Sequence, residues 1–214
     1  MNDHECCLKN VSGKAESRCS KIIEVAYALF LEKGYENVSM GDIVKIAGGS
    51  LATLYKHFGN KEQLFITVLE QQKKSYFDEW GRLSIQYEGK LEQYLYAIGE
   101  NFLELVITDN AVLFHRLIIS VGYMNDKTLS ENMMQRIMLR PTSIIASFLE
   151  KEKARGTICV EDTILCAQQF LHALKEPFML PRLIGVEVDI SEERRNLALK
   201  QIVSIFYKGL THKG

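Results

Sequence analysis

Apolar residues recur at helical spacing along nearly the whole chain. In residues 14–33 the apolar positions Ile22, Ala26 and Phe30 are four residues apart, which places them on one face of a helix. Gly34 follows, at a position where helices commonly end in a left-handed residue. The chain has three prolines and no strong run of alternating β-branched residues, so the pattern predicts an all-α fold.

Three further helix starts follow, each with its own capping signal. Ser39 stands three residues before Asp42, a capping-box spacing that begins a helix over Met40–Ala47. After it come the turn at Gly48 and Gly49, a helix over 51–57 capped by Ser50, and a helix over 61–80 capped by Asn60. Two helices separated by a short turn containing glycine form a helix-turn-helix, whose second helix enters the major groove of DNA.

The helix over 51–57 is expected to have one buried face and one exposed face. At about 100° per residue, Leu54 and Phe58 form the inward face, because they are its large apolar pair at i, i+4. Ala52 and Lys56 then point outward, toward base edges. The flanking positions, whose hydroxyl groups suit phosphate oxygens, are Thr53 and Tyr55, and the positions nearer the core are Leu51 and His57.

The segment "IIEVAYALFLEKGYENVSMGDIVKIAGGSLATLYKHFGNKEQLF" resembles the N-terminal domain of the TetR family of bacterial transcriptional repressors. The resemblance covers residues 17–69, and its most specific part is "TLYKHFGNKEQL". It implies a three-helix DNA-binding domain over 14–61, joined by a long helix to a helical ligand-binding and dimerisation domain over 62–214, after a disordered tail over 1–13. It also implies phosphate contacts at Ser39, Ser50, Thr53, Tyr55, His57 and Lys61, and base-facing positions at Leu51, Ala52 and Lys56.

The segment departs from the family pattern at a few positions. Gly49 stands where the family usually has valine, and Val44 where it usually has alanine. Gly41 weakens its helix by about 1 kcal/mol relative to alanine. Residues 1–61 carry eight Lys and Arg against seven Asp and Glu, so DNA binding should rely on dimer avidity and be sensitive to salt. The alternative is a structural three-helix subdomain in which Tyr55 and His57 are ordinary, partly buried side chains.

Helical patterns continue to the end of the chain. They predict helices over 91–107, 110–123, 128–139, 141–155, 162–175 and 191–210, with "EPFMLPRLIGVEVD" as a loop containing two prolines.

The last two predicted helices have broad apolar faces. A helix that is apolar on two stripes must be covered from two sides, and a symmetry mate would supply the second cover as a four-helix bundle. The alternative is burial within one chain. The predicted homodimer interface consists of Ala167, Leu171, Leu174, Ala198, Ile202, Ile205, Phe206 and Gly209.

An adaptable apolar pocket is expected in residues 85–190, where methionines and aromatic residues are frequent. Its C-terminal part, "LEKEKARGTICVEDTILCAQQFLHAL", resembles the ligand domain of multidrug-type members of the family, which implies a small, mostly apolar or amphipathic effector. The same side chains also suit an ordinary core. The candidates are Phe102, Val106, Phe114, His115, Ile118, Tyr123, Met134, Met138, Phe148, Phe170 and His172.

Composition and charge exclude several classes of protein. The net charge is −1, so any affinity for nucleic acid must come from local sequence. No segment has the pattern of a signal peptide or a transmembrane helix, which predicts a cytoplasmic protein without a membrane partner. The five cysteines show no metal-site spacing, and although His4, Cys6 and Cys7 could bind a metal, a solvated tail is favoured. Cys6 and Cys7 could equally have a redox role.

The sequence also shows no catalytic constellation. Glycine segments such as "AGGS" lack the lysine spacing of a phosphate-binding loop, and Cys166 and His172 lie six residues apart, on nearly opposite sides of one helix. We therefore expect no enzyme and no cofactor. The hypothesis is a homodimeric repressor that binds a palindromic DNA operator and is released by its effector. The alternative is a small-molecule binding protein whose helix-turn-helix no longer binds DNA specifically.

Overall fold

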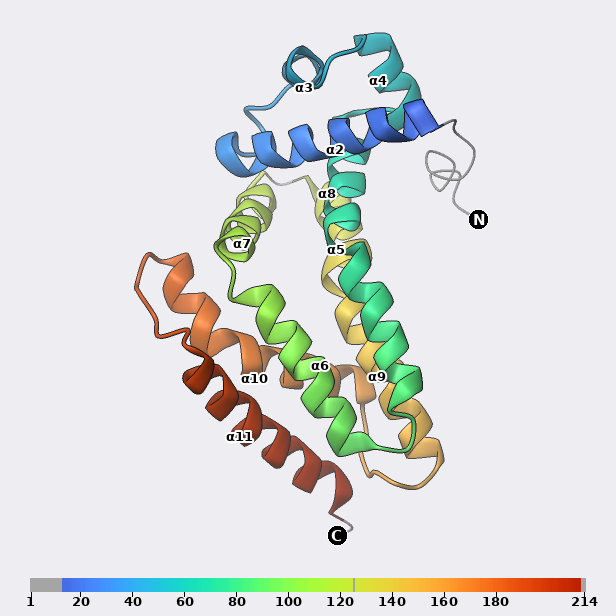
Figure 1. Ribbon diagram of the computed structural model, residues 1–214, viewed down its shortest axis with the longest axis vertical. Coiled ribbons are helices and arrows are strands. Elements are labelled where there is room, and N and C mark those ends of the chain that lie inside the picture. The colour runs from blue at the N-terminus through green and yellow to red at the C-terminus, as the bar shows by residue number, and fades with distance from the viewer. Residues whose placement is uncertain (1–12, 125, 213–214) are drawn as a thin grey trace. The chain divides into compact units, whose positions relative to one another are not determined.

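The computed structural model of the protein describes residues 13–124 and 126–212, in which helices are joined by short turns and no strand occurs (Figure 1). These helices confirm the predicted all-α fold. They are α2 (Gly13–Lys33), α3 (Met40–Ala47), α4 (Leu51–Phe58), α5 (Lys61–Gln86), α6 (Leu91–Val106), α7 (Asp109–Gly122), α8 (Lys127–Met133), the π-helical turn η2 (Met134–Met138), α9 (Arg140–Ala154), α10 (Thr163–Leu183) and α11 (Glu192–Thr211).

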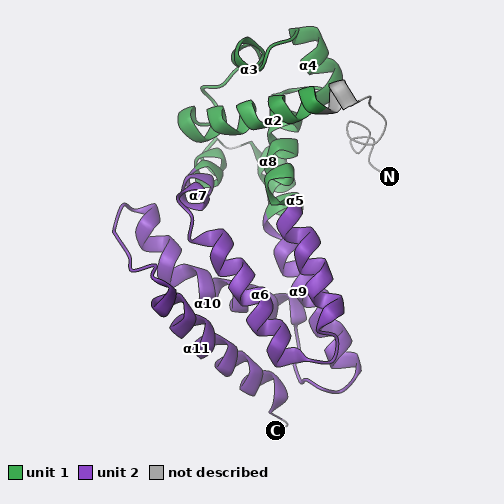
Figure 2. Ribbon diagram, viewed as in Figure 1, with its two compact units in different colours: residues 1–73, 117–137 green, residues 74–116, 138–214 purple. Residues whose placement is uncertain are grey.

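The chain forms two compact units (Figure 2). Among the described residues, unit 1 comprises 13–73, 117–124 and 126–137, and unit 2 comprises 74–116 and 138–212. Helices α5 and α7 each contribute residues to both units. The expected domains, 14–61 and 62–214, were bounded by the helix-turn-helix motif. The two compact units are bounded by contacts between residues, so their boundaries differ from those of the expected domains.

An aromatic cluster forms the core of unit 1. The ring of Phe65 lies 5.0 Å from that of Phe30 and 4.7 Å from that of Tyr35, and all three residues are buried. Isolated helices of eight residues are marginal in water, so α3 and α4 depend on burying their apolar faces within unit 1. The buried residues that these two short helices contribute are Met40, Ile43, Ala47, Leu54 and Phe58.

Unit 2 is built on the packing of α6 against α10 and α11, which lie side by side in Figure 1. Gly99 of α6 permits this approach: a Cβ there would lie 2.5 Å from Cδ1 of Leu199 and 3.2 Å from Cδ1 of Leu174. Real Cβ atoms essentially never lie as close as 2.5 Å, so a larger residue at position 99 would force the end of the Leu199 side chain to move.

The prediction of a loop over 176–189 is wrong for residues 176–183, because α10 continues through Pro177 and Pro181 to Leu183. Phe178 and Met179, between the two prolines, are each 1% exposed and anchor this part of the helix in the core. The prolines are four residues apart and so lie on one side of the helix, where each removes only one backbone hydrogen bond. Burial of the apolar pair outweighs that loss.

The single helix expected over 128–139 is also divided. The α-helical turns end at Met133, and the next five residues form the π-helical turn η2 before α9 begins at Arg140. Within unit 1, Arg136 of this turn donates from Nε and Nη2 to the two carboxylate oxygens of Glu70, each at 2.8 Å. This bidentate pair fixes the orientation of the turn relative to α5.

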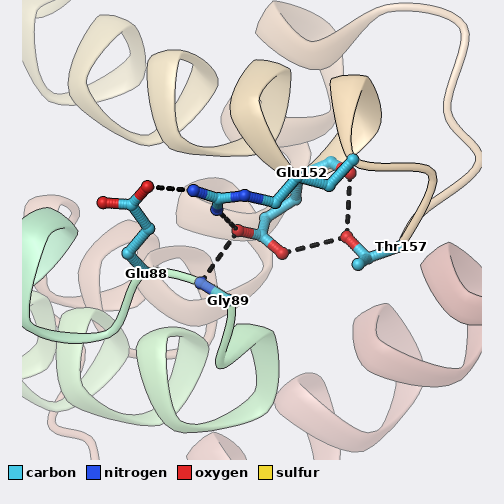
Figure 3. A network of polar contacts seen from close by, with 5 residues as sticks. Glu88, Gly89, Glu152 and Thr157 are labelled. Atoms are coloured by element: carbon cyan, nitrogen blue, oxygen red, sulfur yellow. Dashed lines mark hydrogen bonds and ion pairs between the residues drawn. The ribbon is translucent and has the colours of Figure 1, made fainter.

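A buried carboxylate joins two connections of unit 2 (Figure 3). Glu152 of α9 is 1% exposed, and its Oε1 accepts hydrogen bonds from the backbone N–H of Gly89 at 3.0 Å and from Nη1 of Arg155 at 2.6 Å. Oε2 lies 2.9 Å from the hydroxyl of Thr157, and Arg155 also pairs with Glu88. The carboxylate therefore ties the α5–α6 connection to the end of α9.

Replacing Glu152 with alanine is expected to lower the free energy of unfolding by about 2 kcal/mol, because the hydrogen bonds that its buried carboxylate accepts from Gly89 and Arg155 would be lost. Denaturant unfolding followed by the fluorescence of Trp80, the only tryptophan, measures this change. The control is Glu88→Gln at the exposed end of the network, which should cost less than about 1 kcal/mol. Equal losses in both variants would contradict a special role for Glu152.

Candidate nucleic-acid interface

Two capped helices and a three-residue turn form the helix-turn-helix. At the start of α3 the N–H of Asp42 donates to Oγ of Ser39 at 3.1 Å, while Oδ2 of Asp42 accepts from the N–H of Ser39 at 2.9 Å. These hydrogen bonds from Ser39 keep the pKa of the Asp42 carboxyl below its ordinary value. At the start of α4, Oγ of Ser50 accepts from the N–H of Thr53 at 3.1 Å. Both predicted caps are present.

Helix α4 has the two faces that the sequence predicted. Leu54 and Phe58 are 1% and 4% exposed, whereas Ala52 and Lys56 are exposed on the other side. Tyr55 is 47% exposed, which differs from the partly buried side chain expected of a purely structural subdomain. Of the remaining candidates, Leu51 is 44% exposed, and Thr53 and His57 are half-buried.

Several candidate phosphate contacts already make hydrogen bonds within the chain. The hydroxyl of Ser39 donates to Oδ2 of Asp42 at 2.6 Å, and the hydroxyls of Ser50 and Thr53 lie 2.7 Å apart. A hydroxyl has a single proton to donate, so a phosphate would have to compete with the caps for it. Among residues 17–124 and 126–212, the side chains of Tyr55 and Lys56 have no hydrogen-bond partner, and their polar ends lie on the exposed face.

Lys61 stabilises the join between α2 and α5. Its ammonium donates to the carbonyl oxygen of Tyr35 at 2.9 Å and lies 4.2 Å from the centre of the Tyr35 ring. Burial lowers the pKa of Lys61, and burial together with the carboxylates of Glu62 and Asp126 raises that of Tyr35 to about 12. The ammonium of Lys61 is thus held by the chain, and a phosphate would have to share its donors, so its backbone N–H at the start of α5 is the better donor.

Arg18 is a residue of this face that the sequence reasoning missed. The guanidinium of this exposed side chain on α2 lies against the backbone of Gly49, where a Cβ would be 2.7 Å from Nη2 and 3.2 Å from Cζ. Gly49 also has φ +106°, a conformation that residues with side chains rarely adopt. The signal in the sequence is the glycine at position 49, where the family usually has valine. In the structure it places a cation beside the N-cap residue of α4.

The expected effector residues differ in burial and belong to two units. Phe102, Val106, Phe148 and Phe170 are buried in unit 2, where Phe148 stacks on Tyr94 and Phe170 packs on Phe206. Phe114 is buried and His115 and Met138 are half-buried in the same unit, while His172 is exposed. The candidates in unit 1 are Ile118, which is buried, and Tyr123 and Met134, which are 82% and 49% exposed. Side chains open to water do not enclose a ligand. The expected pocket lining is therefore wrong for His172, Tyr123 and Met134.

The expected interface residues divide in a similar way. Ala167, Leu171 and Leu174 are at most 5% exposed inside unit 2, so these three cannot contact a second chain and are corrected to core residues. Ile205 is 56% exposed and Gly209 is also exposed. Ala198, Ile202 and Phe206 are half-buried against the core of unit 2. Further exposed apolar side chains on the same two helices are Ile164, Leu165, Leu180 and Leu197.

The cysteine and histidine candidates on α10 differ in burial. Burial and the nearby Asp162 carboxylate raise the pKa of the Cys166 thiol, and His172 lies exposed on the same helix. No group of three or more His, Cys, Asp or Glu side chains within residues 17–124 and 126–212 is arranged to hold a metal. His4, Cys6 and Cys7 lie outside the described residues. None of the described helices is long and apolar enough to cross a bilayer.

Two family models match the chain. Residues 22–68 match the model of bacterial regulatory proteins of the TetR family, and residues 93–209 match that of the C-terminal domain of AefR-like transcriptional repressors. The second match alone spans more than half of the 214 residues.

Individual relatives agree with these models. The regulator QacR of Staphylococcus aureus is 36% identical over 77 residues, which are 36% of this chain and 41% of QacR. The regulator SAB2452 of the same species is 30% identical over 95 residues, or 44% of this chain and 50% of that protein. The chain thus aligns with half or less of the length of these relatives.

Solved structures resemble the chain over nearly its full length. A TetR-family regulator from Mesorhizobium loti has a TM-score of 0.78 at 24% identity, covering 94% of this chain and all of that one. The flavonoid-responsive regulator FrrA has a TM-score of 0.74 at 25% identity, covering 92% of this chain and 99% of that one.

Gly49→Ala is expected to destabilise the protein by about 1 to 2 kcal/mol, because alanine is strained at this positive φ and its methyl group displaces Arg18. The matched control is Gly41→Ala within α3, where the new Cβ meets only Oγ of Ser39 at 3.6 Å. That variant should be neutral or stabilise the protein by up to about 1 kcal/mol. Thermal unfolding of the two variants measures the difference, and the opposite order would contradict the described turn.

Proposed function

Because the chain belongs to the TetR family of bacterial regulatory proteins, we propose that it is a ligand-responsive transcriptional repressor that binds a palindromic operator as a homodimer. The observation that carries the proposal is the two-sided α4, whose buried pair Leu54 and Phe58 leaves Tyr55 and Lys56 exposed on a capped helix. Such a helix can enter the major groove, which is wide enough to admit it.

The residues of the DNA face have separate roles in this proposal. Lys56 contacts base edges, where the N7 and O6 acceptors of guanine suit an ammonium group, and Ala52 and Leu51 offer apolar contact to thymine methyl groups. Tyr55 and Arg18 contact phosphates and fix the register of the helix. The hydroxyls of Ser39, Ser50 and Thr53 chiefly maintain the caps, and His57 and Lys61 border the face.

Dimerisation brings two copies of α4 to one operator. Leu197, Gln201, Ile205 and Gly209 follow one another at four-residue spacing along α11 and are all exposed. Leu197 and Ile205 of this stripe, together with Leu165 and Leu180 of α10, offer apolar side chains for a twofold interface with a second copy. Two half-sites about 34–36 Å apart, one turn of DNA, would then be bound at once.

The effector is proposed to be a small, mostly apolar molecule that binds unit 2. Two similarities support a regulated repressor: the AefR-like repressor model over residues 93–209, and the fold shared with FrrA, whose name describes a response to flavonoids. The effector must bind better to the conformation with low DNA affinity, since only differential affinity shifts an equilibrium. The protein would act in the cytoplasm, where the operator DNA lies, and would catalyse no reaction.

Lys56→Ala and Tyr55→Phe test the DNA face by gel shift on the DNA upstream of the gene, at several salt concentrations. Lys56→Ala should weaken operator binding by about 1–3 kcal/mol, and Tyr55→Phe should weaken it less, through one lost phosphate contact. Lys151→Ala, at an exposed lysine on α9 away from α4 and α11, is the matched control and should bind as the parent does. If the parent binds this DNA no better than random DNA, the small-molecule binding protein becomes the preferred function.

Ile205→Asp tests the dimer by sedimentation equilibrium. A charge introduced at the centre of an apolar interface should shift the protein to monomers and weaken operator binding by at least about 100-fold, through the loss of avidity. The matched control is Ile85→Asp, a 72% exposed isoleucine on α5 that lies on neither α10 nor α11. A monomeric parent protein, or an Ile205→Asp variant that stays dimeric, would contradict this interface.

A further inference from the structure

A cleft in unit 2 is lined by none of the expected pocket residues, although Leu113 and Arg116 flank two of them in sequence, and its charged lining residues are Asp109, Arg116, Arg182 and Glu187. It has a volume of about 510 Å³, within the range of roughly 300–1,000 Å³ that is typical of small-molecule sites. One wall is the first two turns of α7, and the other is the end of α10 with the connection to α11. The apolar side chains that line it are Val112, Leu113, Val186 and Val188.

Two arginines at the cleft hold its walls together. Arg116 of α7 donates from Nε to the carbonyl oxygen of Leu183 at 3.2 Å and from Nη2 to that of Arg182 at 3.0 Å, so it satisfies the end of α10. Arg182 of α10 donates from Nη1 to the carbonyl oxygen of Ile107, which is the C-cap residue of α6. Each guanidinium has five N–H donors, and the described bonds use two of each.

The carboxylate that neutralises Arg182 is easily replaced. Nη2 of Arg182 lies 2.6 Å from Oδ1 of Asp109, but the side chain of Arg182 is only 12% exposed whereas that of Asp109 is 97% exposed. Asp109 therefore keeps its hydration and gains little from an ion pair that water screens. The arginine cannot lose its charge and has no other described carboxylate within ion-pair distance.

We propose that this cleft binds an amphipathic carboxylate, which places its apolar body on Val112, Leu113 and Val186 and its carboxylate on Arg182 in place of Asp109. This inference rests on the proposed function for its regulatory meaning, since it assigns the effector a charge and a site. Bidentate pairing with a guanidinium gives the site its preference for a planar anion over a neutral group of the same shape.

The exchange also gives the ligand a route to the rest of the chain. Asp109 is the first residue of α7, and its bond to Arg182 fixes the start of that helix to α10. The first eight residues of α7 belong to unit 2, and its later residues belong to unit 1. A ligand that releases Asp109 thus acts on a helix that contributes to both compact units.

The test uses the full chain without DNA and titrates it calorimetrically at pH 7 with 4-phenylbutanoate and with its neutral amide, 4-phenylbutanamide. The carboxylate should bind at least about tenfold more tightly than the amide. Asp109→Asn retains an oxygen that accepts from Nη2 but removes the competing charge, so it should tighten carboxylate binding by about three- to tenfold and leave amide binding unchanged. A purely structural ion pair would not produce this gain.

Matched variants complete the test. Glu92→Gln removes one negative charge from the first turn of α6, far along that helix from Ile107, and should leave both affinities unchanged. Arg182→Gln should abolish the preference for the carboxylate, with its folding checked by Trp80 fluorescence. Equal binding of the two probes, or weaker carboxylate binding by Asp109→Asn, would overturn the proposal.

Gel shifts with the same probes separate this inference from the proposed function. A protein that binds operator DNA but does not distinguish the carboxylate from the amide loses only the cleft proposal. If Asp109→Asn tightens carboxylate binding but the protein never binds DNA specifically, the cleft proposal stands and the proposed repressor function is contradicted.

Discussion

The burial of two side chains on an eight-residue helix is the constraint on which the candidate interface depends. A helix as short as α4 does not persist by itself, because nucleation costs more than two turns of hydrogen bonds return. Leu54 and Phe58 supply the missing stability by packing into the core of unit 1, and the Ser50 cap satisfies one of the free N–H groups at its start. The same orientation of α4 leaves Tyr55 and Lys56 exposed. The burial that stabilises the helix therefore also determines which of its side chains face solvent.

The turn before α4 shows how a departure from a family pattern can be compensated. A glycine at position 49 removes a side chain that would help to rigidify the turn, yet its positive φ and the contact with Arg18 both require that no Cβ be present. The guanidinium occupies the space instead. Residues 1–61 have almost equal numbers of basic and acidic residues, yet they present a cation next to the N-terminus of α4.

Arginines have a second structural role in unit 2. Arg116 and Arg182 satisfy carbonyl groups at the ends of α10 and α6, where helices lack internal partners. Arg116 lies on α7 and bonds the end of α10, and Arg182 lies on α10 and bonds the end of α6. The pair therefore fixes the end of α10 to the beginning of α7. Each of these guanidinium groups still has unused N–H donors at the cleft. The cleft therefore suits a ligand with hydrogen-bond acceptors such as carboxylate oxygens.

The sequence by itself determined the all-α fold, the short helices with their caps and the two faces of α4, because capping and amphipathic periodicity are local properties. It could not place the end of α10, since only the burial of Phe178 and Met179 outweighs two prolines. The tertiary structure alone decided that Leu171 and Leu174 are core residues. It alone brought Arg182 to Asp109, seventy-three residues away, because such pairing depends on how distant helices pack.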